Sequence, residues 1–344
     1  MAENLENNES EKMLKEEIKS YVDFIDKFYP SYFKAEIAED ANTNLKVLEE
    51  LAKDERPFIR CAIIRNPNIS EELLLKFAND DSGQVREAVA KSEKTPVKIL
   101  EMLSKDDSLT VREFVASNSA TTPDILEKMV RAELEIGEFH AILIQNIYDN
   151  INITPSILDL LTNFKDESLL KIIAVHPMTS TKTLDNLANL GNASICVEVA
   201  SNPHASHATL YKLAYMKETV VLAEVGRNPK SSKATLLKLL KESNNITVLC
   251  SIAQNPNASA DILMSLANDY FLAEYVALNP STSIKVLERI CKGANATAIR
   301  RVIDHPNVTY ELLENLTKDT RFGEMVVSYP AIRKLREIRK IKNT

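Results

Sequence analysis

Hydrophobic and polar positions along this chain repeat with a spacing of mostly 26 residues, ranging from 24 to 32. Each copy is marked by a slot that asparagine occupies most often, and proline follows the slot in eight of twelve copies. The slots are Asp40, Asn66, Ser92, Asn118, Asn150, His176, Asn202, Asn228, Asn255, Asn279, His305 and Tyr329. Proline lacks an amide donor and restrains its predecessor to extended geometry, so the pattern predicts that a helix ends at each slot.

Apolar residues keep fixed positions around the slot. A branched apolar residue stands three positions before it, usually followed by a small residue. Leucine stands eight positions after it in the first eleven copies, and another apolar residue follows three positions later. That separation places both on one face of a second helix, which a Ser, Thr or Asn four residues after most slots is placed to cap. We therefore expect an all-α solenoid of about twelve two-helix repeats over residues 33–330, each repeat burying its apolar face on its neighbours.

Four segments depart from the repeat. Residues 1–9 are polar, and we expect them to be disordered. Residues 10–32 have near-helical apolar spacing and are expected to form an N-terminal capping helix. A longer connector is expected at 131–149, where the interval between two slots is greatest; the alternative is a bend or a partner-contact loop. Residues 331–344 predict a basic C-terminal capping helix, and the alternative is that its basic face binds an acidic or nucleic-acid partner.

The runs Val85-Arg86-Glu87-Ala88-Val89-Ala90 and Val111-Arg112-Glu113-Phe114-Val115-Ala116-Ser117-Asn118, with the Asn-Pro turns and Thr-Pro-type caps, resemble the leucine-rich repeat variant family. That family belongs to the armadillo/HEAT-like α-solenoids, and the resemblance covers about residues 33–335. It implies a right-handed superhelix whose first helices are short and in part 3₁₀. The Val-Arg signature fades after Arg112. Founding members with an iron–sulfur cluster carry a cysteine-rich N-terminal segment that has no counterpart here, so we expect no cofactor.

Composition narrows the function classes. A net charge of −7 and a pI near 5.5 oppose a general nucleic-acid binder, which needs a basic face to neutralise phosphates. The four cysteines stand far apart and form no C-x-x-C pair, which predicts free thiols in a reducing compartment. No apolar run approaches the roughly 18 residues needed to span a bilayer. We expect a cytoplasmic protein without membrane contact.

No grouping of residues predicts catalysis. The five histidines do not cluster with cysteine or aspartate in any repeated register, and His176 and His305 occupy the slot itself. His204 and His207 share one turn-and-cap segment, but two ligands without a neighbouring acid or cysteine are a weak metal signal. We therefore predict no catalytic, cofactor-binding or metal-binding residues.

Charged residues in repeated registers are the candidate partner-binding residues. They are Arg60, Arg65, Arg86, Lys91, Arg112, Glu198 and Glu224. Three of the arginines stand 26 residues apart, and we expect each to pair with the acids of the connector before it. Those acids are Asp54 and Glu55, Asp80 and Asp81, and Asp106 and Asp107. The alternative is that the arginines form a stripe that binds acidic ligands.

We expect a monomeric, non-enzymatic interaction scaffold that binds a protein or peptide on its superhelical surface. The alternative is a HEAT-like nucleic-acid-binding protein or a DNA glycosylase-like enzyme. Such enzymes are expected to carry a basic concave face and aromatic residues. This chain has no Trp, 6% aromatic residues and a negative net charge, so the scaffold is favoured.

Overall fold

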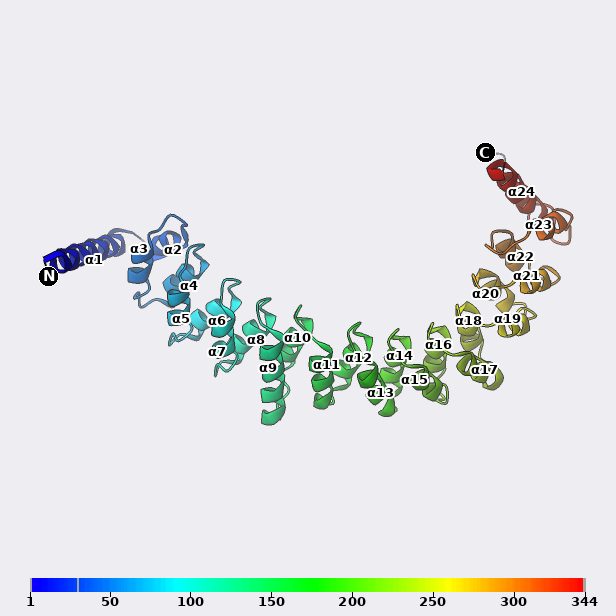
Figure 1. Ribbon diagram of the computed structural model, residues 1–344, viewed down its shortest axis with the longest axis horizontal. Coiled ribbons are helices and arrows are strands. Elements are labelled where there is room, and N and C mark those ends of the chain that lie inside the picture. Colours follow the sequence, from blue (N-terminus) through cyan, green and yellow to red (C-terminus); the bar gives the residue numbers. More distant parts are fainter. Residues whose placement is uncertain (1, 30, 343–344) are drawn as a thin grey trace. The chain divides into compact units, whose positions relative to one another are not determined.

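The computed structural model describes residues 2–29 and 31–342, and within them the side chains of 12–29 and 31–339. All regular elements in these residues are helices (Figure 1). They fall into two units, Met1–Phe164 and Lys165–Thr344. Unit 1 contains α1 (Ala2–Phe28), α2 (Ser31–Glu39), α3 (Leu45–Leu51), α4 (Pro57–Arg65), α5 (Glu71–Phe77), α6 (Gly83–Lys91), α7 (Val97–Leu103), α8 (Leu109–Ser117), α9 (Pro123–Ile136), α10 (Ala141–Asp149), α11 (Pro155–Leu161) and the 3₁₀ helix η1 (Thr162–Phe164). Unit 2 contains α12 (Glu167–Val175), α13 (Thr181–Asn189), α14 (Ala193–Ser201), α15 (His207–Leu213), α16 (Thr219–Arg227), α17 (Lys233–Glu242), α18 (Ile246–Gln254), α19 (Ala260–Leu266), α20 (Leu272–Leu278), α21 (Ile284–Cys291), α22 (Ala296–Ile303), α23 (Tyr310–Thr317) and α24 (Ser328–Lys342).

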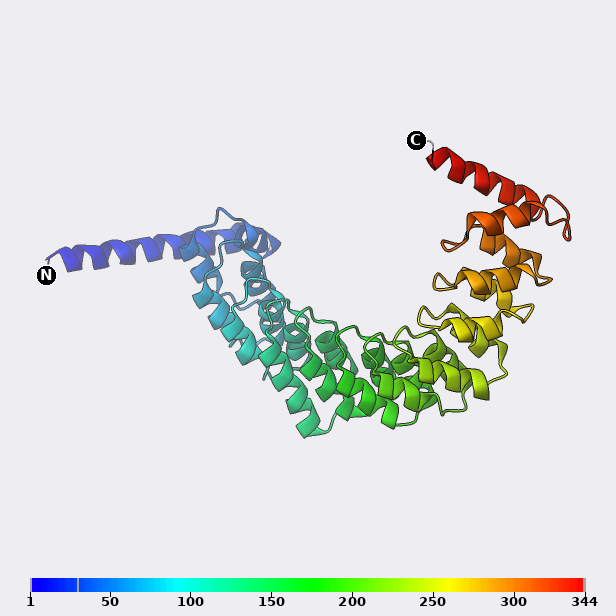
Figure 2. The ribbon, with the colours of Figure 1, turned by 45° about the vertical axis from the view of Figure 1, so that its right-hand side comes forward.

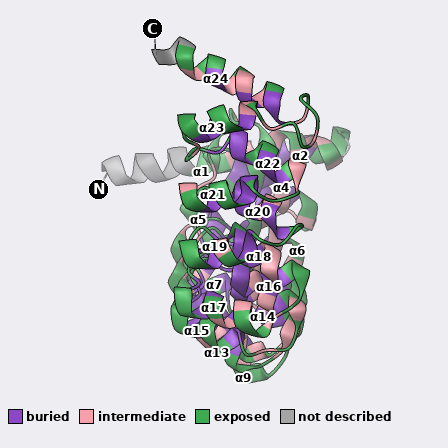
Figure 3. Ribbon diagram, turned by 90° about the vertical axis from the view of Figure 1, so that its right-hand side faces the viewer, coloured by how far each residue is buried: buried purple, intermediate pink, exposed green. Residues whose placement is uncertain are grey.

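Helices α2 to α23 form consecutive pairs, which stack side by side within each unit (Figure 2). The even-numbered helix of each pair is the first helix and the odd-numbered one is the second. Neighbouring first helices pack on one another more extensively than neighbouring second helices do. In unit 2 the buried positions lie between the two layers (Figure 3). The prediction of an all-α solenoid is confirmed.

The apolar positions chosen from the sequence form the core between the layers. All eleven predicted leucines of the second helices are buried, including Leu74, Leu126 and Leu236. The small position after the branched residue lets first helices approach closely. At Gly226 of α16 the approach is tight, because an added Cβ would meet the Cβ of Ser251 in α18 at 3.2 Å.

The first helices are short, as expected, but in the described part of the chain they are α-helices and not 3₁₀ helices. Most of them have nine residues, and many second helices have seven. The 3₁₀ helix η1 follows α11 instead. The first helix ends where the slot residue takes an extended conformation, which the proline one residue later favours.

The twelfth copy does not form a helix pair. Residues 319–327 form turns and loop, and α24 runs straight through Tyr329, where the last slot was predicted. Val327 is buried, whereas the expected Val326 is half-buried. Pro330 is accommodated because it lies in the first turn of α24, where a helix needs no amide donor. The repeat array within the described residues therefore has eleven pairs.

Both ends of the chain differ from the expected bounds. Helix α1 begins at Ala2, so residues 2–9 are helical where disorder was expected, and Met1 lies outside the described residues. The segment contains Ala, Leu and several Glu, residues that favour helix formation without tertiary support. Helix α24 begins at Ser328, three residues before the expected 331, and packs on α22 and α23. Residues 343–344 lie outside the described residues.

The extra length at 131–149 is helix, not connector. Helix α9 continues to Ile136, about two turns beyond most second helices, and α10 starts at Ala141. Gly137 ends α9 in the left-handed conformation, with φ of 76°. The true connector is residues 137–140. Helix α9 continues because Arg131, Leu134 and their neighbours include no proline or glycine before residue 137.

Candidate functional site

The asparagine slot joins neighbouring repeats. Asn66 is buried, and its Nδ2 donates to the carbonyl oxygens of Ala38 at 2.8 Å and Asp40 at 2.9 Å, both in the preceding pair. Its Oδ1 accepts from the amide of Asn68 at 2.8 Å. The same three bonds recur at the other asparagine slots, which are Asn118, Asn150, Asn202, Asn228, Asn255 and Asn279. The side-chain amide is fully used inside the stack.

The hydrogen bonds of the asparagine slots form a ladder along the stack, which we call the asparagine ladder. Histidine takes the place of asparagine at two slots. His305 is buried, its Nε2 lies 2.9 Å from the Asn279 carbonyl oxygen, and its Nδ1 accepts from the Asn307 amide at 3.0 Å. The ring is therefore neutral, with the proton on Nε2. His176 Nδ1 accepts from the Met178 amide at 3.1 Å, and burial lowers the pKa of its imidazole. The predicted structural role of these two histidines is supported by these contacts.

His204 and His207 contact different neighbours. The backbone amide of His204 donates to Asn202, whereas the His207 ring contacts the carbonyl oxygen of Lys230. Within the described residues, no group of three or more His, Cys, Asp or Glu side chains could hold a metal ion.

The repeated arginines form a ladder of ion pairs. Arg60 presents Nε and Nη2 to the two carboxylate oxygens of Asp80, both at 2.7 Å, and its Nη1 donates to the Asp54 carbonyl oxygen at 2.7 Å. Arg86 binds Asp106 in the same way, at 2.7 and 3.0 Å, and donates to the Asp80 carbonyl oxygen at 2.8 Å. The four side chains are largely buried. Each arginine thus joins two connectors.

The partners differ from those expected. We predicted that each arginine pairs with carboxylates of the connector before it; the structure pairs Arg60 and Arg86 with the carboxylate of the following connector. The preceding connector contributes only backbone carbonyl oxygens. Burial alone would raise the pKa of Asp80, but the hydrogen bonds from Arg60 and Ser82 hold this pKa below its usual value, as Arg86 and Ser108 do for Asp106.

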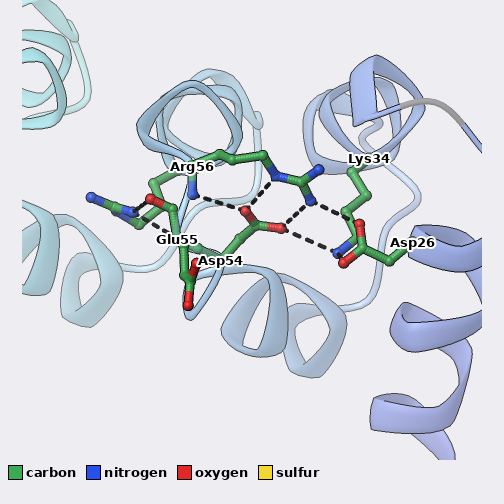
Figure 4. A network of polar contacts seen from close by, with 6 residues as sticks. Asp26, Lys34, Asp54, Glu55 and Arg56 are labelled. Carbon is green, nitrogen blue, oxygen red and sulfur yellow. Dashed lines mark hydrogen bonds and ion pairs between the residues drawn. The ribbon is translucent and has the colours of Figure 1, made fainter.

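The first rung of this ladder is a lysine that the sequence analysis missed. Lys34 stands one repeat before Arg60, is buried, and bridges Asp54 at 3.1 Å and Asp26 of α1 at 2.9 Å. Arg56 closes the cluster by binding both aspartates (Figure 4). Burial would raise the pKa of Asp54, but hydrogen bonds from Arg56 and Lys34 hold it well below its usual value. The repeat register was the signal that could have revealed Lys34.

The fourth rung, at Arg112, is different. Its Nη1 donates to the carbonyl oxygens of Asp106 at 2.9 Å and Asp107 at 3.4 Å, as in the two rungs before it. Among the described residues, its one carboxylate contact is Glu133 of α9, at 3.4 Å from Nη2. Glu133 is buried and lies 2.5 Å from Nδ1 of His140. A cleft of about 360 Å³ opens beside this group.

The remaining candidates lie on first helices of both units. Arg65 pairs with Glu39, and Lys91 lies over the ring of Phe114 at 5.7 Å.

In unit 2, Glu224 pairs with Arg227. The half-buried Glu198 carboxylate has no hydrogen bond or ion pair among the described residues.

The exposed face of unit 2 also carries apolar side chains. At the starts of the consecutive first helices α16, α18 and α20 stand Val220, Ile246 and Phe271, which we call the apolar start row. Their exposed fractions are 60%, 49% and 69%. Val220 and Phe271 share one register, and Ile246 stands one residue earlier in its own repeat. Exposed apolar residues thus recur at the starts of three successive first helices, unlike apolar residues that are exposed singly. Sequence reasoning missed this row because it examined only repeated charges and the buried positions.

Comparisons with known proteins leave the family open. No family model and no curated protein matches the chain. Among solved structures, an engineered protein from a structural genomics consortium matches with 16% identity over 89% of this chain and 93% of its own, at a TM-score of 0.24. In the part of the chain that the structure describes, no helix is long and apolar enough to cross a membrane.

Proposed function

We propose that this protein is a non-enzymatic scaffold that binds an extended peptide segment of a protein partner on the exposed face of the first helices of unit 2. We further propose that its repeats are of the leucine-rich repeat variant type within the armadillo/HEAT-like solenoids. The apolar start row is the single observation that carries the binding proposal. Three exposed apolar side chains at successive helix starts are unfavourable in water unless something covers them.

The register of the first helices supports an extended ligand. The outward positions lie eight, four and one residues before the slot, and in α16 they are Val220, Glu224 and Arg227. Stacking repeats this arrangement along unit 2, so a partner running across α16, α18 and α20 meets one apolar side chain per repeat. Repeat arrays bind extended partners along such surfaces.

The charges beside the row favour a partner with basic side chains. Glu198 of α14 and Glu224 of α16 share one register, and Glu274 of α20 lies nearby in its own helix. Glu224 and Glu274 have their own partners, Arg227 and Arg301, whereas Glu198 has none among the described residues. We therefore expect apolar anchors for affinity and a basic residue near Glu198 for orientation.

The test selects peptides from a random library on the full-length protein and measures their affinity by fluorescence anisotropy. Replacing the row together (Val220→Ser, Ile246→Ser, Phe271→Ser) should weaken the selected peptides about tenfold or more, because anchor side chains dominate such interfaces. The matched control replaces Leu190, Tyr211 and Tyr215, exposed residues outside the row, with Ser and should leave affinity unchanged.

Two outcomes would overturn the proposal. One is a set of peptides whose affinity is equal for the start-row and control variants. The other is that single- or double-stranded oligonucleotides bind the wild type and the start-row variant alters that binding, which would favour the nucleic-acid alternative. Thermal melting of each variant, expected to change little at exposed sites, separates lost binding from lost folding.

A further inference from the structure

Three rungs of the arginine ladder contain a cation–aspartate ion pair, and we call them closed. The fourth rung lacks this pair, and we call it open. In the first three rungs a cation binds the aspartate that stands 20 positions later: Lys34 with Asp54, Arg60 with Asp80, and Arg86 with Asp106. The residue at the same offset from Arg112 is Ala132, and it lies inside the extended α9 because that helix continues to Ile136. The fourth rung therefore has an alanine of α9 at the position where the other three have an aspartate.

One edge of the Arg112 guanidinium is left largely open. On Arg60 and Arg86, the edge formed by Nε and Nη2 takes both oxygens of one carboxylate at 2.7–3.0 Å. On Arg112, Nη2 has one long contact of 3.4 Å to Glu133, and among the described residues no acceptor hydrogen-bonds Nε. A guanidinium fork matches a carboxylate bidentately, and the same fork does so twice earlier in this ladder.

The surroundings suit a carboxylate that carries an aliphatic stem. The cleft of about 360 Å³ is lined by polar residues that include Arg112, Lys105 and three acids, and by an apolar wall of Met129, Ile136 and Leu143. Ile136 is 60% exposed, so part of this apolar wall faces solvent. A volume of this size holds a side chain or a small acid and lies at the lower end of ligand sites.

The acidic groups around the cleft are accounted for as follows. The Asp106 carboxylate is bound by Arg86, and Asp107 is exposed. Glu133 has its second oxygen held by His140, whose Nε2 lies 3.1 Å from Glu138. Because Asp107, Glu133 and Glu138 outnumber Lys105 and Arg112, the cleft has no long-range attraction for an anion. Recognition must come from the fork geometry and the apolar wall, with Glu133 as an internal competitor for the same guanidinium.

We propose that this cleft binds an alkyl carboxylate, with both oxygens on Nε and Nη2 of Arg112 and the stem against Met129 and Ile136. The source is either a glutamate side chain of a partner protein or a free short dicarboxylic acid. The site lies in unit 1 and does not depend on the peptide surface proposed for unit 2.

The direct test is an NMR titration that observes the arginine Nε–H signals of the full-length wild type. The probes are glutarate, a capped Ala-Glu-Ala-Leu peptide and the same peptide with Gln for Glu. The Arg112 signal, assigned by its loss in Arg112→Lys, should move with a carboxylate probe and stay with the Gln peptide, because a bound carboxylate hydrogen-bonds that proton. Signals of Arg60 and Arg86 should not move. A stronger response to the Glu peptide identifies a protein partner, and an equal response to glutarate identifies a free acid.

Variants sharpen the assignment. Arg112→Lys keeps the charge without the fork and should weaken binding about tenfold or more. Glu133→Gln removes the competing charge and should tighten binding by roughly threefold. Arg60→Gln is the matched control from a closed rung and should alter stability but not affinity. If the Arg112 Nε–H signal is unmoved at saturating concentrations of both carboxylate probes, or if Arg112→Lys binds them as the wild type does, the proposal is wrong.

Discussion

Units 1 and 2 differ in the residues at one register position, which are mainly cationic in unit 1 and apolar in unit 2. Six residues before the slot, the first four copies carry cations, and the copies of the second unit carry mainly apolar residues. The cations are Lys34, Arg60, Arg86 and Arg112. Their counterparts in the second unit are Leu170, Cys196, Leu222, Leu249, Ala273 and Ile299. The change begins within unit 1, where Ile144 of α10 takes this position.

The acids change with the cations in only part of unit 2. The partner position is aspartate in the first three rungs, and the counterparts of Leu170 and Cys196 at the same offset are Leu190 and Met216. Acids remain at this offset in three other repeats of unit 2, as Glu242, Asp269 and Asp319. Neighbouring repeats therefore stack both with and without an ion pair at this position of the same backbone. Replacing a buried ion pair by apolar residues is often neutral or stabilising, so the ladder is no evidence that unit 1 is the more stable unit. We expect the two units to differ instead in how their stability depends on pH.

Acidification should cause the largest difference in stability between the two units. Asp54, Asp80 and Asp106 have pKa values held below the usual 3.8 by their cations. A carboxyl with a lowered pKa contributes stability that is fully present above its unfolded pKa of about 4 and is lost as the pH falls through the folded pKa. Hydrogen exchange followed by mass spectrometry should show α4 and α6 losing protection at a higher pH than α14 and α16. Equal loss of protection in both units on acidification would count against the ladder as a determinant of stability.

The asparagine ladder should show no such difference. Asn66→Ala in unit 1 and Asn228→Ala in unit 2 each remove three hydrogen bonds at a buried site. Leaving those backbone groups unpaired should cost about 2–4 kcal/mol of unfolding free energy in either unit. Urea unfolding measures it. A cost below about 1 kcal/mol at either position would mean that water replaces the amide.

Converting one rung of unit 1 to the chemistry of unit 2 tests whether the ion pair is replaceable. Arg86→Leu alone leaves Asp106 without its cation and should destabilise by about 2–3 kcal/mol, given that the pair is not fully buried. Adding Asp106→Leu should recover most of that loss. The two single variants and the double variant form a thermodynamic cycle measured by urea unfolding. If the loss of unfolding free energy in the double variant equals the sum of the two single losses, Arg86 and Asp106 do not stabilise the fold through each other.

The smallest effect is expected for an exposed pair of the same unit. Arg65 and Glu39 form an ion pair whose side chains are 58% and 44% exposed. Arg65→Gln should change the unfolding free energy by about 0–1 kcal/mol, with any loss shrinking at high salt. Thermal melting at low and high salt checks this against Arg60→Gln, which should cost more. Equal costs for the two variants would remove the distinction between buried and exposed arginines.

Local sequence pattern determined much of the fold. The apolar spacing of three, the Ser and Thr caps and the Asn-Pro turns act within one repeat, so each is legible without its neighbours. Ser206, for example, caps α15 by accepting from the Thr209 amide at 2.9 Å, as its position predicts. The shared register of Arg60, Arg86 and Arg112 was also legible, because their spacing equals the repeat.

What a residue contacts in the next repeat was decided only by the tertiary structure. A connector has one repeat on each side, and sequence proximity pointed Arg60 to the acids just before it, whereas stacking brings Asp80 to its fork. The asparagine side chain satisfies its own turn and the preceding repeat at once, which one repeat cannot reveal.

The positions at which some helices begin and end were also decided by the tertiary structure. Tyr329-Pro330 fits the local pattern, yet α24 runs through it while packing on α22 and α23. Helix α9 passes the expected boundary, and Arg112 meets Glu133 of this helix in place of an aspartate. The sequence alone determined the periodic faces, because helix periodicity and capping are local. Only the stacked structure decided which polar groups meet, because those contacts join different repeats.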